Sequence, residues 1–322
     1  MSRAPSLPPA ARAVLDHDRR SLARLISQVE NRDRTVEPVL RALYPHTGHA
    51  RVIGIAGPLG VGKSSLVNAL LRHLRERGQK VGVIAIDPSS PFSGGSVLGD
   101  RIRIDREAGD DGVFFRSMAS RGYAGGIASA TREVARLLDA YGMDLVLVET
   151  VGSGQVDVEI RRVASTSVVV LVPHLGDEVQ SLKAGLFEIA DVFCVNKSDL
   201  PGADGAARYL AEMASLSPEE GGRWRPPVVT TSAIGPRGIP ELWEAVLSHE
   251  RFLDSDGRRA DGERDRVRAE IGDLVRERFD RRLEATLAED QRLRALVDEV
   301  LRRRIDPHAA ADRVFTEMAR RA

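Results

Sequence analysis

A glycine-rich stretch from Gly57 to Ser65 has the spacing of a loop that binds phosphate. It reads GPLGVGKSS and satisfies G-x-x-x-x-G-K-[ST] between an apolar run, residues 52–56, and a helical pattern, residues 63–77. In such a loop, backbone N–H groups line one concavity, the lysine reaches the β and γ phosphates, and the hydroxyl contacts Mg²⁺. We therefore predict phosphate contacts from Lys63 and a metal contact from Ser64. The predicted loop residues are Gly57, Gly60, Val61, Gly62, Lys63, Ser64 and Ser65.

A second motif, NKSD at residues 196–199, has the chemistry to recognise guanine. A carboxylate at Asp199 can accept from the N1 and N2 hydrogens of guanine, whereas adenine has an acceptor at N1 and would leave the charge unpaired. The aliphatic stem of Lys197 can lie against the ring while Asn196 braces the loop. The TSA run at residues 231–233 offers a backbone N–H to guanine O6, so we expect GTP. The predicted base-binding residues are Asn196, Lys197, Asp199, Ser232 and Ala233.

Carboxylates end two of the apolar runs. The run at 145–148 ends on Glu149, the place where phosphate-loop enzymes carry an acid that holds Mg²⁺, usually through water. Asp87 ends the run at 81–86, and Asp100 lies beyond a loop rich in Ser, Pro and Gly that is suited to closing over a ligand. The predicted metal set is Ser64, Asp87, Asp100 and Glu149.

The stretch ETVGSGQ, residues 149–155, is predicted to act on the γ phosphate. Gly152 can present its N–H to that phosphate, and Gln155 can orient the attacking water, although an amide can equally brace a loop. Together with Lys63 these are the predicted catalytic residues. Intrinsic turnover in such sites is on the order of 10⁻³ per second without an added charge-stabilising group, which suits a timer better than a bulk catalyst.

Seven apolar runs alternate with helical patterns between residues 51 and 250. The runs lie at 52–56, 81–86, 113–115, 144–149, 167–172, 191–196 and 227–231, and the helical patterns include 63–77, 126–140, 205–215 and 240–250. This alternation predicts an α/β fold, a P-loop GTPase with a mainly parallel sheet flanked by helices. Ligands of such sheets bind at the carboxyl ends of the strands, where the motifs above are found.

The chain is predicted to have three parts. Residues 1–48 form an N-terminal helical extension of one or two helices, 49–252 the GTPase domain, and 253–322 a C-terminal helical dimerisation arm. The segment 254–265 has the composition of a linker. The helices after it carry apolar stripes, which either pack on the chain's own body or form the dimer contact.

Composition limits the class of protein. The 322 residues contain 47 basic and 47 acidic side chains, so no overall charge directs the chain to nucleic acid or a membrane surface. No apolar run approaches the roughly 18 residues of a membrane span, and the N-terminus has no continuous apolar core of a signal peptide. The single cysteine, Cys194, lies in an apolar run, which predicts a reduced, cytoplasmic protein.

With these motifs in place, the chain resembles the methylmalonyl-CoA mutase-associated GTPase chaperones, a family with the older name of arginine/ornithine transport kinase. The resemblance rests on DPSSPFSGGSVLGDR at 87–101, ETVGSGQ at 149–155, GDEVQSLKAGLFEIAD at 176–191, VNKSD at 195–199 and IDPHAAADRV at 305–314. It implies a homodimer joined through C-terminal helices. It also implies a GTP-gated complex with an adenosylcobalamin-dependent acyl-CoA mutase, in which the GTPase controls cofactor loading and expulsion of damaged cofactor.

The resemblance further implies a switch segment at 176–185 that relays the nucleotide state to the mutase. Lys183 would form an ion pair in that segment, which also contains Asp177 and Glu178. Three residues depart from the family pattern: His174 replaces an expected glycine, Ser153 a valine and Asp157 a glutamate. These departures leave GTP binding intact and bear on the switch geometry and on the identity of the partner mutase.

Three other functions are compatible with a phosphate loop. A GTPase that delivers nickel or zinc shares the strand that ends on Glu, but it needs soft ligands, and this chain has one cysteine, no CxxC and seven scattered histidines. A small-molecule kinase needs an acceptor pocket with a general base, to which no residue can be assigned. A purely structural nucleotide-binding module would not turn GTP over.

Overall fold

The computed structural model describes residues 7–88, 110–120, 126–150, 152, 155–173, 184–215, 224–235, 237–289 and 291–320. The chain divides into two compact units, Met1–Arg266 and Val267–Ala322. Each unit is described by itself below.

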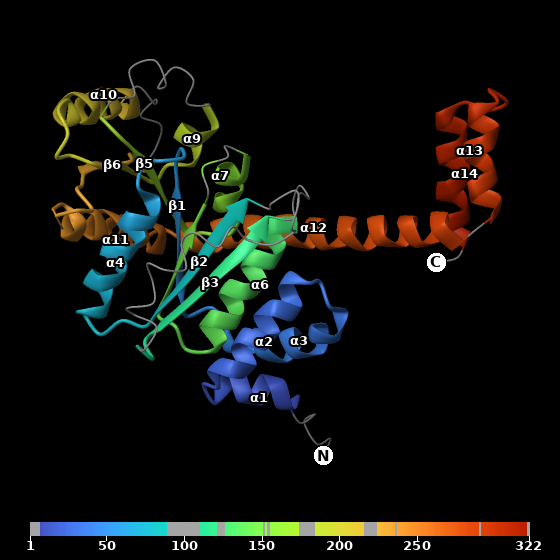
Figure 1. The fold of residues 1–322 in the computed structure, drawn as a ribbon, viewed down its shortest axis with the longest axis horizontal. Coiled ribbons are helices and arrows are strands. Elements are labelled where there is room, and N and C mark those ends of the chain that lie inside the picture. Colours follow the sequence, from blue (N-terminus) through green and yellow to red (C-terminus); the bar gives the residue numbers. More distant parts are fainter. Residues whose placement is uncertain are drawn as a thin grey trace. The chain divides into compact units, whose positions relative to one another are not determined.

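A parallel sheet forms the centre of the first unit (Figure 1). Within the described residues its strands are β1 Arg51–Ala56, β2 Val81–Pro88, β3 Val113–Ser120, β4 Leu145–Glu149, β5 Thr166–Leu171, β6 Val192–Val195 and β7 Val228–Thr230. Their order across the sheet is β3-β2-β4-β1-β5-β6-β7, and every neighbouring pair is parallel. The predicted α/β class is confirmed. Strand β1, which leads into the phosphate loop, lies between β4 and β5.

Helices cover both faces of the sheet. The core on one face contains α4 Lys63–Arg75 and α11 Ile239–Asp254, and the core on the other contains α6 Gly126–Ala140, α9 Ala184–Ile189 and α10 Ala203–Ser215. Figure 1 shows α4 and α6 on opposite sides of the strands. In β4, Leu145 and Leu147 join the first core while Val146 and Val148 join the second, as the alternation of a strand requires. Burial on both faces explains why the strands are apolar throughout.

The N-terminal segment forms three α-helices among the described residues, one more than the largest number predicted. They are α1 Pro9–Leu15, α2 Arg19–Glu30 and α3 Glu37–Leu43. Prolines occupy the first turns of α1 and α3, where a missing N–H costs nothing, and the Asp18 carboxylate caps α2 by accepting from Arg20 N. The apolar side chains of α2 are buried in the same core as α6. These helices therefore belong to the first unit and pack against α6.

The prediction of a linker at 254–265 is wrong for most of these residues, which are helical. Helix α12 spans Arg258–Glu289, so only residues 255–257 separate it from α11. The break falls at Asp256 and Gly257, whose φ angles of 55° and 74° are incompatible with a continuing helix. The charged residues that follow are good helix formers and pair one turn apart, as Arg266 does with Glu263. Charge density alone therefore did not distinguish a linker from a solvated helix.

Helix α12 crosses the boundary between the two units. The second unit contains its residues 267–289 together with α13 Gln291–Leu301 and α14 Pro307–Arg320. Helix α14 begins after Asp306, whose carboxylate accepts from the backbone N–H of His308 and Ala309. Among the described residues, none of the helices combines the length and the apolarity needed to cross a bilayer.

Candidate nucleotide site

The carboxyl ends of the central strands bring the predicted motifs to one edge of the sheet. Glu149, the last residue of β4, is in register with Ile55 of β1 and with Ala85 of β2. Asn196 directly follows β6, and its backbone N–H donates to the carbonyl of Leu171 at the end of β5 over 2.8 Å. The phosphate loop, the acid and the base-reading motif therefore share the edge where parallel sheets bind ligands.

The lysine at the end of the phosphate loop, Lys63, forms hydrogen bonds with the backbone at the start of the loop. Lys63 is 6% exposed, and its Nζ donates to the carbonyl oxygens of Gly57 (2.6 Å) and Pro58 (2.8 Å). Burial lowers the pKa of Lys63, and the negative charges of Asp157 and Glu149 oppose that shift. The ammonium is thus held against the first residues of the loop that is predicted to bind phosphate.

Ser64 and Glu149 are the two residues of the predicted metal set whose side chains the structure describes. Ser64 Oγ donates to Glu149 Oε1 over 2.6 Å. A hydroxyl and a carboxylate are hard oxygen ligands of the kind Mg²⁺ prefers, so these two residues fit that ion. Asp87 lies on β2 two residues beyond Ala85, at the same edge, with its side chain outside the description. Asp100 lies outside the described residues.

The base-reading motif is bonded directly to the phosphate loop. Asn196 is buried; its Nδ2 donates to the Val61 carbonyl over 2.9 Å, and its Oδ1 accepts from Thr231 Oγ1 over 3.2 Å. A Cβ at Gly62, whose φ is 91°, would lie 2.6 Å from Asn196 Nδ2, so the loop needs glycine there. Lys197 Nζ donates to the Gly60 carbonyl over 2.8 Å. The two motifs are therefore held together by direct hydrogen bonds.

Asp199 is exposed at the site and oriented by a neighbour from the TSA run. Ser232 Oγ donates to Asp199 Oδ1 over 2.6 Å, and this bond lowers the pKa of Asp199. Ser198 N donates to the Thr231 carbonyl over 2.9 Å, which joins the two segments through their backbones. A charged carboxylate with a fixed orientation can accept both N–H groups from the guanine edge, and Ala233 lies next to Ser232 on the same segment.

Gly152 packs against the phosphate loop. Its φ is 85°, and a Cβ there would lie 2.5 Å from Leu59 N, 2.7 Å from Pro58 C and 2.8 Å from Gly57 O. Gln155 begins α7 Gln155–Glu159, with its side chain outside the description. Gly152 therefore lies directly against the backbone of the phosphate loop.

Several predicted residues lie outside the described part of the chain. These are Asp100, Ser153, His174, Asp177, Glu178 and Lys183. Two supporting contacts were not predicted: the Thr231 side chain donates to Asn196, and Thr150 donates to Asp157. The signal available for both is a threonine directly after an apolar strand.

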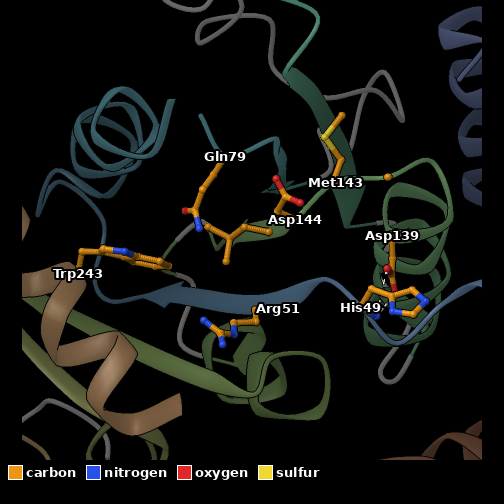
Figure 2. A pocket seen from close by; sticks show the side chains of 9 residues that line it. His49, Arg51, Gln79, Asp139, Met143, Asp144 and Trp243 are labelled. Carbon is orange, nitrogen blue, oxygen red and sulfur yellow. Dashed lines mark hydrogen bonds between the residues drawn. The ribbon is translucent and has the colours of Figure 1, made fainter. Parts of the chain in front are cut away.

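A hollow of about 340 Å³ lies at the opposite edge, at the amino-terminal ends of β1 and β4 (Figure 2). Its carboxylates are engaged by the backbone: Asp139 accepts from Gly48 N and from Ala50 N (3.0 Å), and Asp144 accepts from Lys80 N (2.7 Å). These bonds tie the turns before the strands together. They give Asp139 and Asp144 a structural role.

A phosphate loop bonded to a guanine-reading motif, at the carboxyl edge of a parallel sheet, defines a P-loop GTPase. The family described as methylmalonyl Co-A mutase-associated GTPase matches residues 22–288. The chain belongs to this family, and the predicted resemblance is confirmed.

Individual proteins agree with this assignment. A protein of Pyrococcus horikoshii that is named as a GTPase is 44% identical over 306 residues, which cover 94% of this chain and 96% of the relative. The mouse methylmalonic aciduria type A homolog, named as mitochondrial, is 31% identical over 264 residues, covering 81% of this chain and 63% of the relative. The crystal structure of LAO/AO transport system kinase is similar over 99% of both chains, with a TM-score of 0.72 and 26% identity.

Proposed function

We propose that the chain is a Mg²⁺-dependent GTPase chaperone that gates adenosylcobalamin loading into an acyl-CoA mutase and protects or reactivates that mutase. The observation that carries this proposal is the family match over residues 22–288, because the family is described by its association with methylmalonyl-CoA mutase. The mouse relative, named for methylmalonic aciduria, supports the same association. The partner is methylmalonyl-CoA mutase or a close relative.

The proposed chemistry follows from the site. Lys63 and the loop N–H groups bind the β and γ phosphates, and the metal site combines Ser64 and Glu149 with Asp87 and Asp100. Bound Mg²⁺ supplies positive charge to the phosphate oxygens. Gly152 contacts the γ phosphate, and Gln155 orients water. Intrinsic turnover in sites of this class is slow without an added charge-stabilising group, so we expect slow turnover until a partner binds.

The nucleotide state is proposed to reach the mutase through residues 176–185. In this proposal Lys183 forms an ion pair in that segment, which also contains Asp177 and Glu178. Helix α9, which follows the segment, packs against α7, which begins with Gln155. A change at Gln155 can therefore be passed directly to the end of the switch segment.

We also propose that the second unit forms the homodimer contact. Ile271, Val275 and Phe279 recur every four residues on α12, and they are 58%, 60% and 42% exposed. Spacing of four places them on one face of the helix, and a stripe of exposed large apolar side chains is typical of a protein interface. The cytoplasm is the proposed compartment, because Cys194 is a free and buried thiol.

The chain's single cysteine, Cys194, is not suited to binding nickel or zinc for delivery to another protein. Burial raises the pKa of Cys194 to about 12, so the thiolate that would bind a soft metal does not form near neutral pH. A small-molecule kinase remains the second candidate, because a similar solved structure carries the name of a transport system kinase. Release of one inorganic phosphate per GTP without an added acceptor would exclude it.

The proposal is tested by mixing the chain with an adenosylcobalamin-dependent methylmalonyl-CoA mutase. We expect a complex with a non-hydrolysable GTP analogue, and cofactor loading that differs between that analogue and GDP. Lys63→Ala should abolish the nucleotide dependence. Lys80→Ala, which removes an exposed lysine outside the site, is the matched control and should retain it. Cofactor loading that is the same with and without the chain would refute the chaperone role.

A further inference from the structure

Asp157 is a fully buried carboxylate beside the nucleotide site. Its side chain is 0% exposed on the short helix α7. Burying a carboxylate is costly unless it is hydrogen-bonded or paired with a cation. Thr150 Oγ1 donates to Asp157 Oδ1, and the Thr150 side chain is itself buried. A buried hydroxyl therefore bonds a buried carboxylate across the segment that follows β4.

The Thr150–Asp157 bond closes the turn between β4 and α7. Thr150 directly follows Glu149, and its backbone N–H donates to the Ile55 carbonyl over 3.1 Å, which fixes it to β1. Gly152, inside the turn, is pressed against the backbone of the phosphate loop. The turn thus carries Glu149 at one end, Gly152 in the middle and α7 at the other end.

Asp157 also acts electrostatically on the phosphate-binding lysine. Its charge is the largest influence that raises the pKa of Lys63, ahead of Glu149, and the Lys63 ammonium also donates hydrogen bonds to the carbonyls of Gly57 and Pro58. A negative charge held behind Lys63 favours the ammonium form that phosphates require. Replacing the carboxylate with an amide would remove that charge and weaken the acceptor of the Thr150 bond.

We propose that Asp157 is a positioning residue of the GTPase reaction: by accepting from Thr150 it fixes the turn that holds Glu149 beside Ser64 and Gly152 against the phosphate loop. This inference rests on the proposed GTPase function. Asp157 need not touch nucleotide. Contacts to the base and to the β phosphate come from other segments, so the loss of Asp157 should affect the γ-phosphate step and the metal far more than GDP binding.

The test compares Asp157→Asn, Thr150→Val and the double variant with the wild-type chain. Either single change should lower kcat for GTP by about 10-fold to 100-fold, the effect of one charge-assisted hydrogen bond, while the Kd for GDP stays within about 2-fold. The double variant should be no slower than the slower single variant, because both changes remove the same bond. Thr150→Val removes only the hydroxyl donor, so it serves if Asp157→Asn does not fold.

Two further variants separate positioning from general damage. Asp157→Glu keeps the charged acceptor, and glutamate is the residue expected here in the family pattern, so kcat should stay within about 5-fold of wild type. Asp204→Asn removes an exposed carboxylate in the first turn of α10 and should leave kcat unchanged. Wild-type kcat in both Asp157→Asn and Thr150→Val would overturn the inference, as would an equal loss of GDP affinity and turnover.

Absence of GTP hydrolysis by the wild-type chain would refute the proposed function. This inference would then be tested by a second measurement. If the wild-type chain does not hydrolyse GTP, the Mg²⁺ concentration needed for tight binding of a non-hydrolysable GTP analogue is measured instead. The inference predicts that this concentration rises about 10-fold in Thr150→Val, because Glu149 is no longer held in place, and is unchanged in Asp204→Asn. An unchanged Mg²⁺ requirement in Thr150→Val would overturn the inference.

Discussion

Gly152→Ala provides a quantitative test of how closely the turn after β4 packs against the phosphate loop. The added Cβ would lie 2.5 Å from Leu59 N, and relief to the ordinary contact of 3.4 Å requires the loop or the turn to move by about 0.9 Å. A misplacement of about 1 Å at a catalytic site costs on the order of 100-fold in rate. The positive φ of 85° adds about 1–2 kcal/mol of backbone strain.

The assay measures GTP turnover, GDP affinity and thermal stability of Gly152→Ala beside a matched variant, Gly78→Ala. Gly78 has a similar φ of 76°, yet a Cβ there meets nothing within 4 Å, so it carries the strain without the collision. Both variants should lose roughly 1–2 kcal/mol of unfolding free energy from strain, but only Gly152→Ala should lose about 100-fold in kcat. Equal kcat values for the two variants would show that the turn does not press on the loop.

Three further outcomes follow from the described contacts. Burial raises the pKa of Asp191 to about 6 and lowers that of His249 to about 4, so between pH 6 and 4 Asp191 gains stability as pH falls while His249 loses it. Relative to the wild-type chain, Asp191→Asn should therefore lose unfolding free energy between pH 6 and 4 and His249→Gln should gain it, each by up to about 3 kcal/mol in pH-dependent denaturant unfolding; differences from wild type of the same sign would contradict this. Asn196→Ala leaves the Val61 carbonyl without its partner, and GDP affinity measured by calorimetry should fall by roughly 10-fold to 100-fold, whereas an unchanged affinity would remove Asn196 from the site. Native Cys194 should resist a thiol reagent until the chain unfolds, because burial raises its pKa to about 12, and rapid labelling of folded protein would argue against that burial.

The sequence predicted the fold and the chemical types in the site because both are encoded locally. An apolar run buried on both faces of a sheet has a recognisable composition, and the phosphate loop packs its glycines, Lys63 and Ser64 into one short stretch. Asn196 and Asp199 were predictable for the same reason: one short motif after a strand contains both. The direct bonds from Asn196 and Lys197 to the phosphate loop were not predictable, because the two segments are more than a hundred residues apart in the chain.

The residues that support the site were harder to find. Thr231 donates one hydroxyl hydrogen bond to Asn196, and Thr150 donates one to Asp157. Neither threonine belongs to a motif with a recognisable spacing. Asp157 drew notice only as a departure from the family, and its burial was not predictable from a stretch that also contains Gly152 and Gln155. The start of α12 was missed because charged residues are equally compatible with a linker and with a solvated helix.

The central claim is that guanine nucleotide is bound at the carboxyl edge of the sheet and recognised there by Asp199. The most direct measurement is calorimetric binding of GDP, ADP and xanthosine diphosphate to the wild-type chain and to Asp199→Asn. We expect tight binding of GDP and negligible binding of ADP by the wild-type chain, and a change of preference from GDP to xanthosine diphosphate in the variant. Equal affinity for GDP and ADP, or an unaltered preference for GDP in Asp199→Asn, would contradict the claim.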